Sequence, residues 1–400
     1  MFNINTSTFL KGCLILIFFS ILGCASAPQR NPLPLEFTNH ASISGVPKAR
    51  FWGDEWPKYS VEQFHESSDA ELKQAFGEAY DAPHNYLAIS GGGAQGAYGA
   101  GLLYGWGEAG ARPEFTMVTG VSTGALSAPF AFLGADYDKT LKMVYTQMST
   151  KDILKKRYFL SAILNDSMAD TTPLKNTIAK FITNDVIEAI AEEYKKGRRL
   201  FIGTVNLDAS RSVIWNIGEI AASNHPGKNE LIREILRASA VIPVAFPPVV
   251  IQVEANGQQY DELHVDGGTG SQVFVYPAAI DWKLITQKLK VHGKPHIYVI
   301  RNSILEPNYQ GVKREIVPIA SRTIGSLIRT QGIGDLYQIF ALCERDDNEF
   351  NLAYIPADFV EEPKEEFDPV YMGKLFDLGY QHGRKGYNWE KAPPNFYNNQ

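Results

Sequence analysis

Short apolar runs that stop at glycines alternate with helix-like stretches in the middle of the chain. The run Tyr86–Ser90 ends at three glycines, and the run Phe115–Thr119 ends at Gly120. The stretches that follow them, 94–109 and 125–133, have the length and apolar content of buried helices. This order of strand, glycine turn and helix predicts an α/β protein, with parallel strands in a sheet that helices cover.

Further elements are expected on both sides of these units. The preceding segment contains Trp52, Trp56 and a helix-like stretch at 69–79, and it is expected to pack on the main domain. The last fifty residues, rich in proline, asparagine and tyrosine, give no clear pattern. Strands are also predicted at 200–205, 212–217 and 296–301, and a largely helical region at 313–343.

The N-terminus has the pattern of an export signal. Lys11 precedes the apolar run Cys13–Leu22, which is much shorter than the roughly 20 residues of a membrane-spanning helix. The following Ile-Leu-Gly-Cys resembles the lipobox of bacterial lipoproteins, which implies that Cys24 is lipidated. A plain secretory signal with a chance cysteine is the alternative. Ala25, in place of an aspartate, favours the outer over the inner membrane of a bacterial envelope.

Composition and length limit the remaining possibilities. The chain has 400 residues, 44% hydrophobic and 20% charged, which suits a large globular core. With a net charge of −6 and no basic run, nucleic acid is not expected as a partner, and docking on anionic lipid is not evident. If Cys13 leaves with the signal and Cys24 is blocked, Cys343 can form neither an internal disulfide nor a cysteine metal cluster. We divide the chain into a signal peptide (1–23), a proline-rich tether (24–50), an accessory segment (51–84), a core domain (85–275) and C-terminal strand and helices that complete or flank this core (276–400).

The pentapeptide Gly120-Val-Ser122-Thr-Gly124 fits the pattern G-x-S-x-G. Flanking glycines permit a sharp turn from strand to helix, which exposes the serine hydroxyl at the helix N-terminus. The helix dipole there favours developing negative charge. Ser122 is therefore a candidate nucleophile, although a structural serine in a glycine turn would look the same.

The triple glycine Gly91-Gly92-Gly93, followed by Ala-Gln-Gly96, ends the first strand. Successive glycine N–H groups at a helix start can stabilise an oxyanion, and no side chain blocks the approach. The string also fits the dinucleotide pattern G-x-G-x-x-G, but the second strand ends in the serine pentapeptide and not in an acidic residue. An oxyanion hole is the better interpretation.

The segment His264-Val-Asp266-Gly267-Gly268 provides a candidate base. A serine hydroxyl needs a proton acceptor, and an aspartate before two glycines can lie on a tight, open turn. Asp-Gly is also a common turn dipeptide, so a purely structural role is the alternative. His264 is the nearest histidine that could act as the base.

The three motifs together, in this order and each at a strand end, resemble the patatin-like phospholipases. The resemblance covers roughly 86–272, and more loosely 323–337. It implies a three-layer α/β/α fold with a mainly parallel sheet and a phospholipid or other acyl-ester substrate. It implies a dyad of Ser122 and Asp266, with Gly91, Gly92 and Gly93 as oxyanion hole, no cofactor and no metal. Gly96, Gly120, Gly124, Gly267 and Gly268 support these motifs.

Two further positions relate to the family pattern. Gln95 stands where the family often has a basic residue, which leaves headgroup preference and catalytic rate open. Ser239, in Arg-Ala-Ser-Ala-Val-Ile-Pro, is interpreted as structural or positioning. The sequence carries no D-x-D-x-D-G loop that would imply calcium, and it does not indicate acyl length, scissile position or oligomeric state.

Two alternatives remain open at this point. One is an α/β-hydrolase esterase with a Ser-Asp-His triad, for which His264, His292, His296 and His382 are candidates, although His296 is expected to begin a strand. The other is a lipoprotein that binds lipid or a partner without catalysis.

Overall fold

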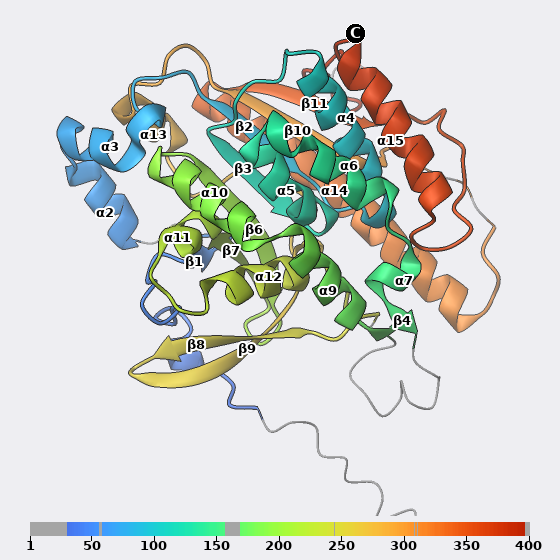
Figure 1. Cartoon of the computed structure of the whole chain (residues 1–400), viewed down its shortest axis with the longest axis horizontal. Coiled ribbons are helices and arrows are strands. Elements are labelled where there is room, and N and C mark those ends of the chain that lie inside the picture. Colours follow the sequence, from blue (N-terminus) through green and yellow to red (C-terminus); the bar gives the residue numbers. More distant parts are fainter. Residues whose placement is uncertain are drawn as a thin grey trace, which may run out of the picture.

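The chain is described by a computed structural model for residues 30–396, apart from 56–57, 157–168, 244, 308 and 310. The predicted signal peptide and Cys24 lie outside the described residues. Helices cover both faces of a central sheet, which gives three layers (Figure 1). The α/β class is therefore confirmed.

In the described residues the central sheet has nine strands: β1 (Arg50–Trp52), β2 (Asn85–Ile89), β3 (Met117–Val121), β6 (Arg199–Asn206), β7 (Arg211–Asn216), β8 (Val249–Ala255), β9 (Gln258–Asp266), β10 (His296–Ile304) and β11 (Glu349–Ile355). Its centre, in the order β6-β3-β2-β10-β11, is parallel. Beyond β6 the pairing is antiparallel, through β7 and β1 on one path and β9 and β8 on the other. Strands β4 (Lys155–Lys156) and β5 (Ala169–Asp170) form a separate pair. The mainly parallel centre confirms the predicted sheet.

Each central strand buries both faces. In β2, Leu87 and Ile89 belong to one hydrophobic cluster, and Tyr86 and Ala88 to a second on the opposite face. The first cluster packs under α4 (Gly96–Glu108), α5 (Thr123–Leu133), α6 (Asp138–Thr146), α7 (Thr150–Ile153), α9 (Thr172–Phe181), α10 (Asn184–Lys195), α11 (Ile217–Ala222), α12 (Lys228–Ser239) and α15 (Pro369–Arg384). The second packs under α2 (Lys58–Glu66), α3 (Asp69–Phe76), α13 (Trp282–Lys288) and α14 (Ile316–Asp346).

The predicted elements are confirmed with small shifts in their ends. The second strand begins at Met117 and not at Phe115, because the register of β3 on β2 starts where Met117 faces Tyr86. Each chemical motif follows or ends a strand, as expected. Single 3₁₀ turns complete the described structure at η1 (Leu35–Phe37), η2 (Gly77–Ala79), η3 (Gly93–Gln95), η4 (Ala135–Tyr137) and η5 (Gly267–Thr269).

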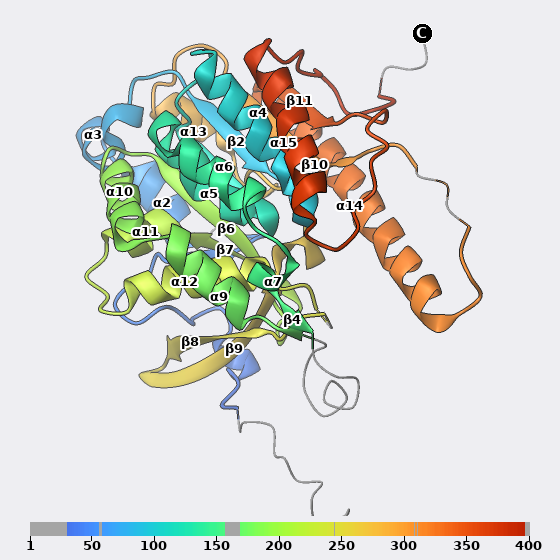
Figure 2. The ribbon, with the colours of Figure 1, turned by 45° about the vertical axis from the view of Figure 1, so that its right-hand side comes forward.

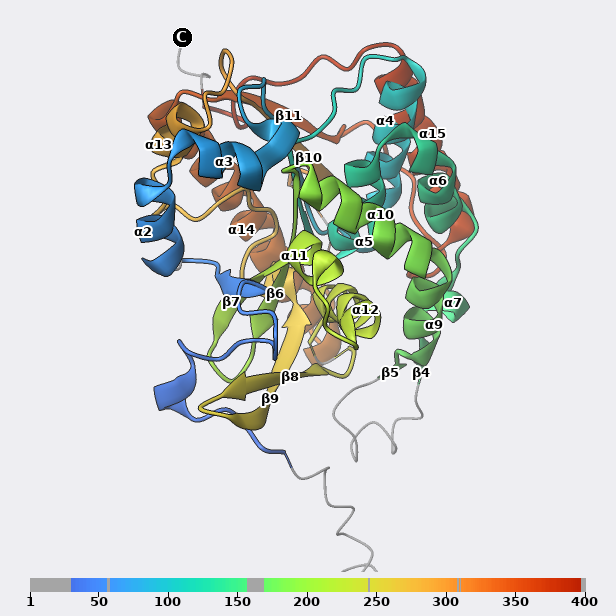
Figure 3. The same ribbon diagram turned by 60° about the vertical axis from the view of Figure 1, so that its left-hand side comes forward.

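The hairpin β8–β9 and the N-terminal segment form the lower end of the molecule in Figure 3. The segment expected as a tether is packed here from residue 30 onward, since Leu33, Ile43 and Val46 are buried. Ser42 also bridges to Glu254 of β8. Of the predicted tether, only 24–29 lie outside the described residues. The apolar side chains between the prolines account for the packing.

Helix α14 differs along its length. Leu336, Ile339, Phe340 and Cys343 of its C-terminal half are buried against the sheet, whereas its N-terminal half projects from the body (Figure 2). Among the described helices, none is both long and apolar enough to cross a membrane.

Candidate active site

Ser122 occupies the sharp turn between β3 and α5. Its φ is 55°, a left-handed conformation that a residue with a side chain adopts only when its surroundings enforce it. The flanking glycines make room for the turn. A Cβ at Gly120 would lie 2.6 Å from Gly124 O, and a Cβ at Gly124 would lie 2.2 Å from Ile89 O. The turn puts Ser122 at the N-terminus of α5, with 9% of its surface exposed.

Asp266 is the last residue of β9, and its carboxylate meets the Ser122 hydroxyl. Ser122 Oγ donates to Asp266 Oδ2 at 2.6 Å, and the Gly268 N–H donates to Oδ1 at 2.7 Å. Burial raises the pKa of Asp266 to about 6, and these two hydrogen bonds offset only part of that rise. The structure thus brings together the two residues, 144 positions apart, that the sequence motifs indicated.

The glycine-rich loop passes directly beside the serine turn. A Cβ at Gly91 would lie 3.2 Å from Ser122 Cβ, so a side chain there would crowd the serine. The Gly91 N–H donates to Gln272 O at 3.0 Å. Because an N–H has one hydrogen, Gly91 is not available as an oxyanion donor in this arrangement, which corrects that part of the prediction. Within the described part of the chain, no hydrogen bond engages the N–H of Gly92 or Gly93.

Two residues of strand β10, which no sequence motif indicated, hold this loop by hydrogen bonds. Arg301 Nη1 donates to Gly91 O and to Ser90 Oγ, both at 3.1 Å. Asn302 donates from its backbone to Ser90 Oγ at 2.8 Å and from Nδ2 to Ser90 O at 3.0 Å. Burial lowers the pKa of Arg301 to about 10, which leaves it charged at neutral pH. In the sequence, the only sign of this role is that Arg301 and Asn302 are adjacent polar residues that follow the apolar part of a predicted strand.

Ser239 holds the backbone of the turn at Ser122 by a hydrogen bond. Its Oγ accepts from the Ser122 N–H at 3.0 Å and donates to Gly203 O at 2.7 Å, in a fully buried position. This contact agrees with a positioning role. Gln95 donates from Nε2 to the Tyr371 hydroxyl at 3.5 Å, toward α15.

The histidines considered as bases have partners elsewhere. His264 is fully buried, with Nδ1 3.0 Å from Thr204 Oγ1 and Nε2 3.0 Å from Glu262 Oε2. The other contacts are His292 with Asp81, His296 with Glu349 and His382 with Tyr98. In the described residues, none of these contacts reaches Ser122 or Asp266. The same residues contain no group of three or more His, Cys, Asp or Glu side chains placed to hold a metal ion.

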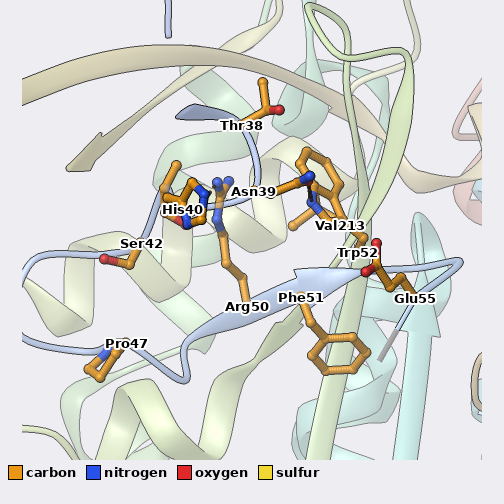
Figure 4. A pocket seen from close by; sticks show the side chains of 11 residues that line it. Thr38, Asn39, His40, Ser42, Pro47, Arg50, Phe51, Trp52, Glu55 and Val213 are labelled. Carbon is orange, nitrogen blue, oxygen red and sulfur yellow. Dashed lines mark hydrogen bonds between the residues drawn. The ribbon is translucent and has the colours of Figure 1, made fainter. Parts of the chain in front are cut away.

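Two cavities differ in their relation to this site. One of about 600 Å³ lies beside β1, with Arg50 and Trp52 among its lining residues, and none of the motif residues lines it (Figure 4). Another of about 450 Å³ touches Val121 and Gly267, the immediate neighbours of the nucleophile and the carboxylate. It reaches Asp335 of α14. Of these two cavities, the second is the one that adjoins the site, and it lies between the sheet and α14.

Comparison with known families assigns the region that carries these motifs. Residues 87–279 match the model of the patatin-like phospholipases, and the match includes the glycine-rich loop, Ser122 and Asp266. This part of the chain is a patatin-like phospholipase domain, which confirms the resemblance seen in the motifs. Such a domain belongs to the hydrolases of lipid acyl esters.

Structural comparison adds a distant similarity. The chain is similar to the crystal structure of VipD from Legionella pneumophila, with 14% sequence identity and a TM-score of 0.36. The match covers 76% of this chain. The chain spans 66% of the length of VipD. No curated protein matches the chain.

Proposed function

We propose that this protein is a serine acyl hydrolase that cleaves carboxylic esters of membrane phospholipids, with Ser122 as nucleophile and Asp266 as base. The observation that carries the proposal is the 2.6 Å hydrogen bond from Ser122 Oγ to Asp266, at the end of a strained turn beside the glycine-rich loop. The patatin-like domain supports acyl-ester chemistry on lipids. The partners of the histidines favour a dyad over a triad.

The reaction proceeds in two acyl transfers. Asp266 takes the Ser122 proton as the Oγ–carbon bond forms, and the π electrons of the carbonyl move to its oxygen. Collapse of this intermediate expels the alcohol, which receives the proton from Asp266. Water then repeats the sequence on the acyl-enzyme, so that a fatty acid leaves and Ser122 regains its proton.

The raised pKa suits Asp266 to this role. An aspartate at the ordinary value of about 3.9 is a weak base, whereas a pKa of about 6 makes it roughly a hundredfold stronger and still mostly ionised at pH 7. Burial against the sheet end, with hydrogen bonds but no cation among the causes of the shift, produces this strength.

Gly92 and Gly93 are the proposed oxyanion donors. The Gly92 N–H belongs to the same peptide group as Gly91 O, which accepts from the Arg301 guanidinium. A positive charge at this carbonyl polarises the peptide and strengthens the N–H at its other end. The family often has a basic residue at the position of Gln95, which is uncharged. Arg301 would supply some of that missing positive charge through the Gly91 carbonyl.

We further propose lipidation at Cys24 and a place in a bacterial cell envelope, at the outer rather than the inner membrane. Only five residues, 25–29, lie between Cys24 and Arg30, the first described residue. A chain of this length spans at most about 20 Å. Such an anchor would hold the packed body close to the bilayer that contains its substrate.

The deciding experiment combines labelling with turnover. The purified protein is treated with a fluorophosphonate probe and assayed on defined phospholipids, lysolipids and short p-nitrophenyl esters. Wild type should be labelled at Ser122, and Ser122→Ala should lose the label and at least about 10³-fold in kcat. Ser44→Ala, an exposed serine of the N-terminal segment, is the matched control. A folded wild type that is neither labelled nor active, or an active Ser122→Ala, would contradict the proposal.

A further inference from the structure

The N-terminal half of α14, residues 316–330, is exposed over most of its described surface. Its described side chains are exposed apart from three that are partly covered, whereas the C-terminal half is buried against the sheet. Figure 2 shows this half projecting beyond the rest of the molecule. At about 1.5 Å per residue the projecting half is some 20 Å long.

Large apolar side chains line one side of the projecting half. The most exposed are Ile316 at 87% and Leu327 at 65%, followed by Ile324 at 54% and Ile319 at 50%. At 3.6 residues per turn these positions, with Ile328, fall within one half of the helix circumference. A contiguous apolar face of this size on a projecting helix indicates a surface for interaction, because exposure to water is unfavourable.

The local charge of this region is opposite to that of the whole chain. Residues 309–331 contain four basic side chains and one acidic side chain, a net +3, whereas the whole chain carries −6. Arg322 and Arg329 are seven positions apart and lie on the side of the helix away from Leu327. The remaining basic residues are Lys313 and Arg314, which are exposed just before the helix starts.

We propose that residues 313–330 are the surface by which the protein docks on an anionic phospholipid membrane. An apolar helix face that is preceded by exposed basic side chains can lie in the bilayer interface, with the apolar groups among the acyl chains and Lys313 and Arg314 at the phosphates. The choice of a lipid partner rests on the proposed function. Charge complementarity selects anionic over neutral phospholipid.

The base of the projecting half is joined to the candidate active site. Gln331 Nε2 donates to Gly270 O at 2.6 Å, and Asp335 Oδ2 accepts from the Gln272 N–H at 2.6 Å. Gln272 O in turn receives the N–H of Gly91 in the glycine-rich loop. The base of the projecting half therefore contacts the segment that follows Asp266, which places the proposed docking surface on the same side of the sheet as that segment.

Sedimentation with vesicles tests this docking surface. Three proteins are compared: wild type, Ile324→Asp/Leu327→Asp and Lys313→Gln/Arg314→Gln. Each is mixed with vesicles of phosphatidylcholine alone, or of phosphatidylcholine that contains about 30% phosphatidylglycerol. The aspartate pair should weaken binding to the anionic vesicles at least about tenfold. The glutamine pair should weaken it about 25-fold, and only on anionic vesicles. Val360→Asp, which changes an exposed aliphatic residue elsewhere, should bind as wild type does.

Two readouts separate this proposal from its rivals. The α14 variants should hydrolyse a soluble p-nitrophenyl ester at the wild-type rate, which also shows that they are folded. Ser122→Ala should bind vesicles fully, so loss of catalysis and loss of docking are distinguishable. Wild-type vesicle binding by Ile324→Asp/Leu327→Asp would overturn the proposal. So would light scattering that shows a wild-type dimer made monomeric by this pair without change in vesicle binding, since the face would then be an interface between two copies.

Discussion

Glu262 and Asp266 lie on the same face of β9, four residues apart, and both are buried, yet their surroundings give them opposite properties. Burial disfavours the charge of Glu262, but the hydrogen bond with His264 and the charge of Arg50 outweigh it and hold its pKa at about 2. Burial acts in the same way on Asp266, where the hydrogen bonds of Ser122 and Gly268 leave the pKa at about 6.

The difference lies in the partners of Glu262, which are the hydrogen bond with His264 and the cation Arg50. Arg50 contacts both carboxylate oxygens of Glu262, which fixes that group as a permanent anion that joins β1 to β9. Asp266 receives only uncharged donors, so its affinity for a proton stays high enough to take one from a hydroxyl. One strand thus carries a structural carboxylate and the proposed base, and their neighbours give the two groups opposite properties.

The largest expected effect is on turnover. Asp266→Asn should reduce kcat on a p-nitrophenyl ester at least about 10³-fold, because the amide cannot accept the Ser122 proton. Glu262→Gln should leave the kcat of the folded protein within about tenfold of wild type, since Glu262 does not touch Ser122. If the two substitutions reduced kcat equally, the division of roles between these carboxylates would be wrong.

The next effect is on stability. Arg50→Met leaves Glu262 buried without its cation and should lower the free energy of unfolding by about 3–5 kcal/mol, measured by urea denaturation. Arg211→Met is the control, because Arg211 pairs with the largely exposed Asp54 and Glu55, and it should cost about 1 kcal/mol or less. Similar losses in both variants would show that the Arg50–Glu262 pair is no stronger than a surface pair.

The smallest effect depends on pH. Because the folded pKa of Asp266 lies above the unfolded value of about 3.9, the folded state binds the proton more tightly, and this contribution to stability is lost as the pH rises through about 6. Asp266→Asn removes the buried charge, so relative to wild type it should gain up to about 3 kcal/mol between pH 4 and pH 8.

Urea denaturation of both proteins at the two pH values measures this change, and other titrating groups cancel because both proteins share them. A difference that does not vary with pH would contradict the raised pKa. In wild type, kcat on a soluble ester should fall about tenfold per unit below pH 6, as Asp266 becomes protonated.

Much of the fold and the two central residues could be predicted because their signals are local. The run Tyr86–Ser90 and its glycines mark a strand end within a few positions, and the glycines around Ser122 are required by contacts within the same turn. The position of Asp266 at a strand end follows from two adjacent glycines in the same way.

The remainder depends on contacts between distant segments. Arg50 and Glu262 are 212 positions apart, and Arg301 reaches Gly91 across 210, so no local pattern pairs them. The Gly91 N–H was predicted to be an oxyanion donor, but it donates to Gln272 O. This bond joins two backbone groups, so the residue type at position 272 does not reveal it. The hairpin β8–β9 was missed although β8 alternates buried and exposed positions up to an Asn-Gly turn, because the polar and charged residues at 254–262, among them the buried Asp261 and Glu262, do not resemble a strand.

The left-handed backbone of Ser122 has a consequence for how this protein can change over time. Glycine adopts such a backbone without strain, so Ser122→Gly would relieve the turn but would also remove the hydroxyl that the proposed reaction needs. A lineage that no longer needed this hydroxyl could relieve the strain by a single substitution. Serine at position 122 therefore carries a conformational strain that glycine would not, and its proposed role as nucleophile accounts for that strain.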